Sequence, residues 1–160
     1  MRTFHFDIIA HDSTGKIILL VEVKARHFEN RQHRDGLIEQ VQSYLQALQA
    51  VNMKIPFAML VDLEKIEIFR GNTSDWSEPV SSLQTATVLS HYEPEYGKKR
   101  IFYPYLERLV ESWLRDLAYH WKSETPPASE QLAEIGLLQK LAGGTTYSNF
   151  KMALSGETLY

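Results

Sequence analysis

A carboxylate and an ammonium group two residues apart are the side chains of this sequence best suited to chemistry. Glu22 and Lys24 lie within an apolar, β-branched run over residues 17–24, which predicts a buried strand. Side chains two apart on a strand leave the sheet on the same face. Burying an ionised group is costly, so this pair should emerge at an open strand end or bind something that offsets the penalty.

A second carboxylate, that of Asp7, comes from the preceding strand. Residues 3–10 are typical of a strand and residues 11–16 of a tight turn, so the two strands form a hairpin. Strict alternation places Phe6 and Ile8 on one face of the first strand and Asp7 on the other. A loop over residues 12–15 sets Asp7 diagonal to Glu22, and a register shift of two sets it directly opposite.

In either register the two carboxylates are close enough to share a hard cation. Oxygen ligands suit Mg²⁺, and Mn²⁺ can substitute for it at such a site. The residues therefore predict a divalent-metal site on Asp7 and Glu22.

The rest of the chain supplies helices and further strands. Apolar spacing predicts helices over residues 37–51, 103–122 and 130–141, and strands over residues 56–62, 65–70 and 88–92. This order favours an α/β (α+β) fold with a mixed sheet flanked by helices. We expect a single domain over residues 1–160, with a core over about 3–92 and a C-terminal helical extension over about 103–160.

Composition excludes several classes of protein. The 17 Lys and Arg residues against 20 Asp and Glu residues give a net charge of −3, so nucleic acid could be held only by a local basic patch. With no cysteine, thiolate metal sites, disulfides and thiol nucleophiles are absent. The sequence contains no apolar stretch of membrane-spanning length, so we expect a cytoplasmic protein without a membrane partner.

Asp7 followed by Glu22-Val23-Lys24 resembles the motif of the PD-(D/E)XK nuclease superfamily. The helix segment from Gln40 to Tyr44 resembles the Gln-x-x-x-Tyr signature found in several of its branches. The strands over residues 57–62 and 66–70 are similar to those of the N-terminal nuclease domains of type I restriction enzyme motor subunits. The resemblance covers about residues 4–70.

The resemblance implies a restriction-endonuclease-like fold and a role for each motif residue. Asp7 and Glu22 would hold one or two Mg²⁺ ions, with the carbonyl of Val23 completing the coordination. Lys24 would orient water or stabilise charge in the transition state, and Gln40 would hydrogen-bond Lys24 or nucleic acid. The implied activity is that of a Mg²⁺-dependent phosphodiesterase, an endonuclease or exonuclease that acts on DNA. The alternative is a catalytically degenerate module that binds nucleic acid or a protein partner.

Two basic segments could contact DNA phosphates or serve only as solvated surface. One lies over residues 24–34 and the other over residues 98–100. The candidate nucleic-acid contacts are Arg26, Arg31, Arg34, Tyr44, Lys98, Lys99 and Arg100.

The sequence departs from the family pattern in two places. Phe6 stands where many members have Pro, and only six residues precede Asp7, where many members have a helix with an acidic residue. Three explanations stay open: a native start upstream of Met1, a protein partner that supplies this N-terminal element, or a site that lacks one carboxylate. A homodimer is a further expectation from the aromatic helix over residues 103–122.

Overall fold

The first two strands form the predicted hairpin. In this computed structural model, which describes residues 2–25, 31–73, 75–76 and 78–154, β1 (Arg2–His11) pairs antiparallel with β2 (Ile17–Val23). The Asp12 carboxylate stabilises the turn by accepting the backbone N–H groups of Thr14 (2.9 Å) and Lys16 (3.0 Å).

An irregularity between Ala10 and His11 then shifts the register of this hairpin, so that Ile8 pairs with Val21. Continuing this register by one residue places Asp7 opposite Glu22. The register with Asp7 diagonal to Glu22 is therefore wrong, and the shifted alternative is confirmed.

The strands after the hairpin extend the sheet on one side. Helix α1 (Arg31–Ala50) connects β2 to β3 (Phe57–Val61), which pairs parallel to β2, as a crossover helix allows. β4 (Lys65–Arg70) and β5 (Ser81–Gln84) follow as antiparallel neighbours. The strand order is β5-β4-β3-β2-β1-β6, a mixed six-stranded sheet.

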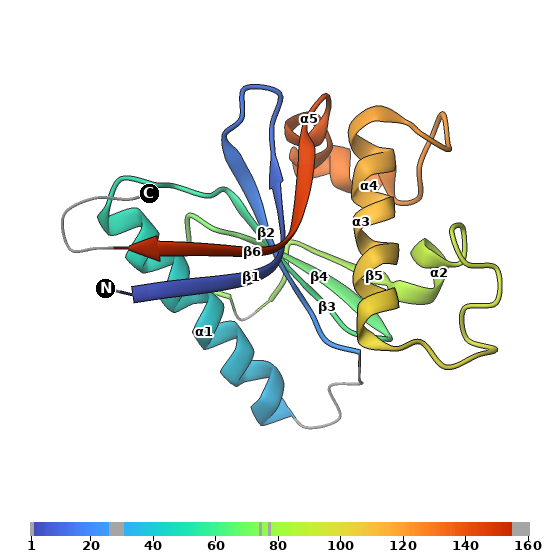
Figure 1. The fold of residues 1–160 in the computed structure, drawn as a ribbon, viewed down its shortest axis with the longest axis horizontal. Helices are drawn as coiled ribbons and strands as arrows, with labels where there is room; N and C mark the ends of the chain where they lie inside the picture. Colours follow the sequence, from blue (N-terminus) through green and yellow to red (C-terminus); the bar gives the residue numbers. More distant parts are fainter. Residues whose placement is uncertain (1, 26–30, 74, 77, 155–160) are drawn as a thin grey trace.

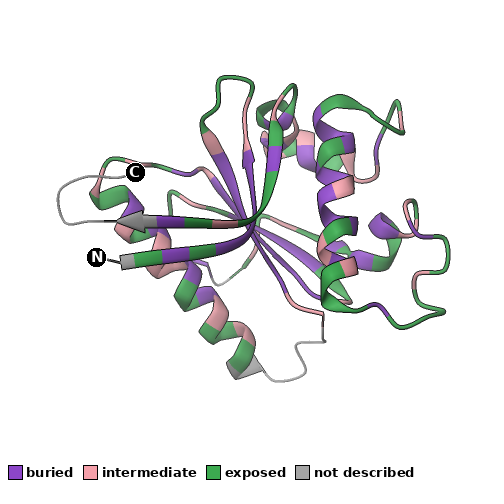
Figure 2. Ribbon diagram, viewed as in Figure 1, coloured by how far each residue is buried: buried purple, intermediate pink, exposed green. Residues whose placement is uncertain are grey.

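Helices cover both faces of this sheet (Figure 1). The apolar stripe of α1, including Val41, Leu45 and Leu48, packs on one face against Leu20 and Leu60. The other face is covered by α3 (Tyr103–Tyr119), and its core residues Leu106, Val110, Trp113 and Leu117 pack against a second apolar cluster that includes Val21 and Met59. Figure 2 shows the buried residues concentrated along the strands between these helices. The predicted mixed α+β fold is thus confirmed.

Three expectations for the later part of the chain are wrong. Residues 85–89 form helix α2 (Thr85–Leu89), where a strand over 88–92 was expected, because the strand signal there reflects burial of Val88 and Leu89 in the core. The helix expected over 130–141 is divided into α4 (Ser129–Glu134) and α5 (Leu137–Leu141) by Gly136, whose φ is 85°.

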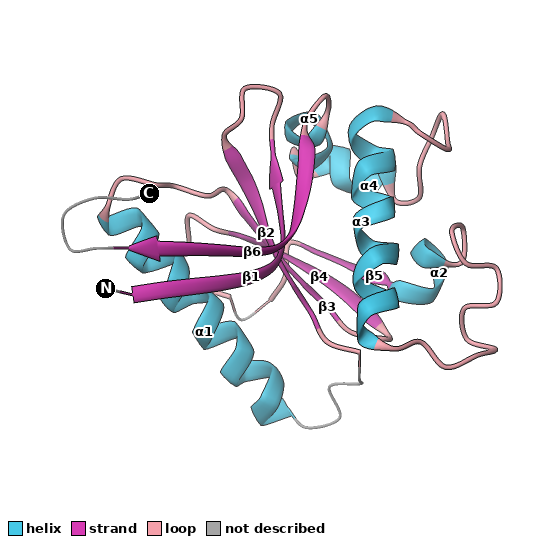
Figure 3. Ribbon diagram, viewed as in Figure 1, coloured by secondary structure: helices cyan, strands magenta, loops and turns pink. Residues whose placement is uncertain are grey.

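The C-terminal extension is also not helical throughout. Residues 145–154 form strand β6 (Thr145–Leu154), which pairs antiparallel along the whole of β1 (Figure 3). Without β6, β1 would be the edge of the sheet and would present a row of unpaired backbone N–H and C=O groups. Among the described residues, no helix has the length and apolar character needed to cross a bilayer.

Candidate active site

Asp7 lies where the regular alternation of β1 is interrupted. Phe4 and Phe6 pack in the cluster on the α1 face, whereas Ile8 packs in the cluster on the α3 face, so the two faces exchange at Asp7. The expectation that Phe6 and Ile8 share a face is therefore wrong. Asn149 of β6, which the strand register would place opposite Asp7, has a positive φ of 53°. A local break of this kind redirects a side chain out of the normal strand pattern.

The redirected Asp7 carboxylate connects three elements of the fold. Its Oδ2 accepts a hydrogen bond from the backbone N–H of Val23 in β2 at 2.7 Å. Its Oδ1 accepts one from the phenol of Tyr103, in the first turn of α3, at 2.7 Å. The side chain is 4% exposed, so these bonds hold it in one orientation with little competition from water.

Glu22 lies beside Asp7 and carries an unsatisfied oxygen. The residue is 8% exposed, and its Oε1 has no hydrogen-bond partner among the described residues. Burial, then the charge of Asp7 and a hydrogen bond with that carboxyl, raise the pKa of Glu22 to about 9, while Lys24 opposes the shift. Buried polar atoms are nearly always satisfied, so an orphaned carboxyl oxygen is a feature that needs a ligand or another explanation.

The other motif residues lie near this pair, but not all in the expected contacts. Lys24 is half-buried, and its charge is close enough to stabilise the Glu22 anion. The Gln40 amide donates to the Tyr44 phenol oxygen at 2.6 Å, where an interaction with Lys24 or nucleic acid was expected. The Tyr44 ring packs against Phe4, with centroids 4.7 Å apart, so these two α1 residues brace the helix against β1.

Two residues of the site were missed in the sequence. Tyr103 binds Asp7 directly. Glu107, one turn later on α3, hydrogen-bonds Tyr103. Burial raises the pKa of Glu107, and the nearby Asp7 charge raises it by a smaller amount. Their i,i+4 spacing puts both on one face of the helix. That spacing was a detectable signal, but nothing local shows that this face meets residue 7, which is 96 positions away.

The chemistry of the Asp7 and Glu22 oxygens fits a hard divalent cation. The unpartnered Oε1 of Glu22 is available to coordinate a cation, and it lies beside a second carboxylate, as in a pair of Mg²⁺ ligands. Within the described part of the chain, no group of three or more His, Asp or Glu side chains is arranged to hold a metal ion. A cation at this position would therefore take two carboxylates from the protein and its remaining ligands from water or substrate.

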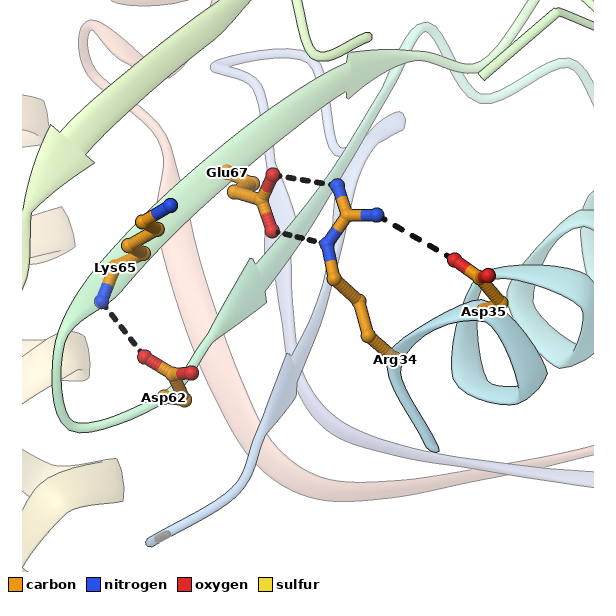
Figure 4. A network of polar contacts seen from close by, with 5 residues as sticks. All are labelled: Arg34, Asp35, Asp62, Lys65 and Glu67. Carbon is orange, nitrogen blue, oxygen red and sulfur yellow. Dashed lines mark hydrogen bonds and ion pairs between the residues drawn. The ribbon is translucent and has the colours of Figure 1, made fainter. Parts of the chain in front are cut away.

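The first of the two basic segments offers little free charge where it is described. Arg34 Nε and Nη2 donate to the two oxygens of buried Glu67 at 2.9 and 2.6 Å, and Asp35 lies 3.6 Å from Nη1 (Figure 4). This fork-shaped ion pair fixes the start of α1 to β4, so the expected phosphate contact by Arg34 is replaced by a structural one. Arg26 and the side chain of Arg31 lie outside the described residues.

The three residues of the second basic segment, 98–100, differ in how accessible their charges are. Lys99 Nζ is 2.5 Å from Glu93 Oε1, and it lies over the ring of Tyr105, so its charge is neutralised within the fold. Lys98 and Arg100 are exposed. These two side chains are the ones that remain accessible to a phosphate.

Comparisons of the chain with family models, with curated proteins and with solved structures found no match.

Proposed function

We propose that this protein is a metal-dependent phosphodiesterase that acts on DNA, with Asp7 and Glu22 as the metal-binding carboxylates and Lys24 as the cation beside them. The observation that carries the proposal is the buried, unpartnered Oε1 of Glu22 next to the oriented carboxylate of Asp7. A salt-bridged structural pair would leave neither carboxyl oxygen without a partner.

The surrounding residues favour a cation over an isolated pair of acids. Two buried carboxyl groups in contact cannot both ionise cheaply, and a bound cation would stabilise the doubly ionised form further than Lys24 does. The Val23 N–H and the Tyr103 phenol hold Asp7 in place before any ligand arrives. When bound, Mg²⁺ would supply an activated water and neutralise phosphate charge.

Lys24 is positioned to act on the substrate. It follows the last residue of β2, where its backbone N–H donates to the carbonyl of Val61 at 2.8 Å, so the strand fixes where its side chain begins. Its ammonium lies near enough to influence Glu22, so it would be close to a phosphate bound at the proposed cation, where it would stabilise growing negative charge. We assign Lys24 the stabilisation of that charge.

Calorimetric titration of Mn²⁺ tests the proposed centre without a known substrate. The wild type should bind Mn²⁺, and Asp7→Asn and Glu22→Gln should each abolish binding while retaining the circular dichroism of the fold. Lys24→Ala should still bind Mn²⁺ but lose Mn²⁺-dependent cleavage of DNA, because it removes a group that acts on phosphate and not a ligand.

Glu67→Gln is the matched control, since it alters another buried carboxylate of the same sheet whose oxygens are both occupied by Arg34. This variant should bind Mn²⁺ as the wild type does. A folded wild type that binds no Mn²⁺, or binding that survives both Asp7→Asn and Glu22→Gln, would overturn the proposal and favour the non-catalytic module.

A further inference from the structure

An exposed aromatic residue directly precedes the first residue of α3, which binds the candidate active site. Phe102 is 60% exposed, and it directly precedes Tyr103, whose phenol binds Asp7. The carboxyl end of β2 and the first turn of α3 come together at the lower right of Figure 1, so α3 begins beside the site.

Helix stability does not account for a phenylalanine at this position. Phe102 is the N-cap residue of α3, a position where Ser, Thr, Asp or Asn can accept a backbone N–H. The helix has no side-chain hydrogen bond at this cap, and it does not need one there: Pro104 has no N–H, and the Tyr105 N–H donates to the carbonyl of Phe102 at 3.1 Å. The ring is also not buried, so it gains little from the hydrophobic effect.

A cation accompanies this ring. The Arg100 guanidinium carbon is 5.0 Å from the centroid of Phe102, and Arg100 is itself exposed. Lys98, also exposed, adds a second accessible charge two residues earlier, whereas Lys99 between them is paired with Glu93. An exposed aromatic ring flanked by accessible cations is the combination with which proteins hold single-stranded nucleic acid, by stacking one base and contacting its phosphates.

We propose that Phe102, Arg100 and Lys98 bind an unpaired DNA strand, with one base stacked on the Phe102 ring and the adjoining phosphates against the two cations. Duplex DNA keeps its base faces stacked inside the helix, so it cannot use this ring without unpairing. One part of the inference rests on the proposed function, namely that the neighbouring nucleotide of the bound DNA would lie toward Asp7 and Glu22. The substrate class is therefore single-stranded DNA or an unpaired DNA end.

Fluorescence anisotropy with a labelled oligodeoxythymidylate of about 12 nucleotides tests this binding. A metal chelator is present throughout, so that cleavage cannot consume the probe. The wild type should bind this probe more tightly than a labelled duplex of equal length. Phe102→Ser should weaken binding by at least about fivefold, since one stacked base contributes about 1–3 kcal/mol. The same variant should leave the thermal midpoint almost unchanged, because the Phe102 ring is exposed and the first turn of α3 does not depend on a side-chain cap.

Three further variants separate this role from general effects of surface change. Tyr119→Ser removes an exposed aromatic from the opposite end of α3 and should leave the affinity unchanged. Arg100→Gln should make the slope of log affinity against log salt shallower by about 0.7, the value for one phosphate contact to a single strand. Lys99→Gln should leave that slope unchanged, because its charge is already neutralised by Glu93.

The possible failures of this inference and of the proposed function are distinguishable. Equal affinity for duplex and single strand, no binding of the single strand, or unchanged binding by Phe102→Ser would overturn the inference, whatever the Mn²⁺ titration shows. Phe102-dependent binding of the single strand in a protein that does not bind Mn²⁺ would support the inference and overturn only the catalytic proposal.

Discussion

Replacing Glu22 with Gln should stabilise the metal-free protein at neutral and higher pH and change it little at low pH. In the folded chain, burial first, and then the neighbouring Asp7 charge, raise the pKa of Glu22 from its ordinary value of 4.5 to about 9. Gln has the shape of the protonated acid and can donate to Asp7, but it cannot ionise. The substitution therefore removes a titration without removing volume.

The sign and size of the effect follow from proton linkage. Between pH 4.5 and about 9 the unfolded chain loses the Glu22 proton while the folded chain keeps it. The folded state then binds more protons, so the free energy of unfolding falls as the pH rises. The fall is about 1.4 kcal/mol per pH unit inside this window, which amounts to about 3 kcal/mol by pH 7. The stability that protonated Glu22 contributes to the fold is fully present only below the pKa of Glu22 in the unfolded chain, which is 4.5.

Urea unfolding of the wild type and Glu22→Gln, at about pH 5 and about pH 8 with a chelator present, measures this contribution. The histidines and other acids titrate in both proteins, so the difference between the two curves isolates Glu22. That difference should grow by about 3–4 kcal/mol between the two pH values, with equal m-values.

A difference that stays constant with pH would refute the reasoning, since it would mean that Glu22 titrates alike in the folded and unfolded chains. Mn²⁺ provides an internal check. Added Mn²⁺ should stabilise the wild type at about pH 8, because a ligand that binds only the folded state shifts the equilibrium toward it, and it should not stabilise Glu22→Gln.

Three further substitutions test other parts of the structure. Tyr103→Phe removes a hydrogen bond that orients Asp7, and it should weaken Mn²⁺ binding by about tenfold in calorimetry. Arg34→Ala leaves Glu67 buried without its cation and should lower the free energy of unfolding by about 3 kcal/mol in urea. Gly144→Ala should lower the thermal midpoint and cost about 3 kcal/mol, because a Cβ there would overlap the carbonyl oxygen of His11.

Each of these variants has a matched control. Tyr105→Phe alters a phenol of the same helix that binds Glu93 instead, so equal losses of Mn²⁺ affinity in the two phenylalanine variants would argue against a role for Tyr103. Asp35→Ala, at an exposed ion pair, should change stability by less than about 0.5 kcal/mol, and a loss as large as that of Arg34→Ala would contradict the account of Glu67. Gly36→Ala in α1 meets no atom and should stabilise by up to about 1 kcal/mol, in contrast to Gly144→Ala.

Local patterns in the sequence were sufficient for the elements around the site. The hairpin, the helix that follows it and strands β3 and β4 are each indicated by apolar periodicity and turn residues, and the structure confirms them. The shared face of Glu22 and Lys24 stays a prediction, because β2 ends at Val23 and Lys24 follows it. These features depend on interactions within a few residues, so a single sequence contains them.

The environment of Asp7 required the tertiary structure. Its position opposite Glu22 depends on the irregularity between Ala10 and His11, and a register shift of one residue exchanges every side chain between faces. The break at Asp7 itself, where the faces of β1 exchange, interrupts an alternation that looks regular in the sequence. Residues of similar character on both faces conceal such a break.

The long-range partners of the site were also decided only by the fold. Tyr103 reaches Asp7 across 96 residues, and β6 pairs with β1 from the far end of the chain. Contacts of this kind are selected by how the helices and strands pack together, and the local sequence on either side does not specify them. The residue types at this site therefore follow from the sequence, whereas the unpartnered oxygen of Glu22, the bonds that hold Asp7 and the exposed ring of Phe102 follow from tertiary packing.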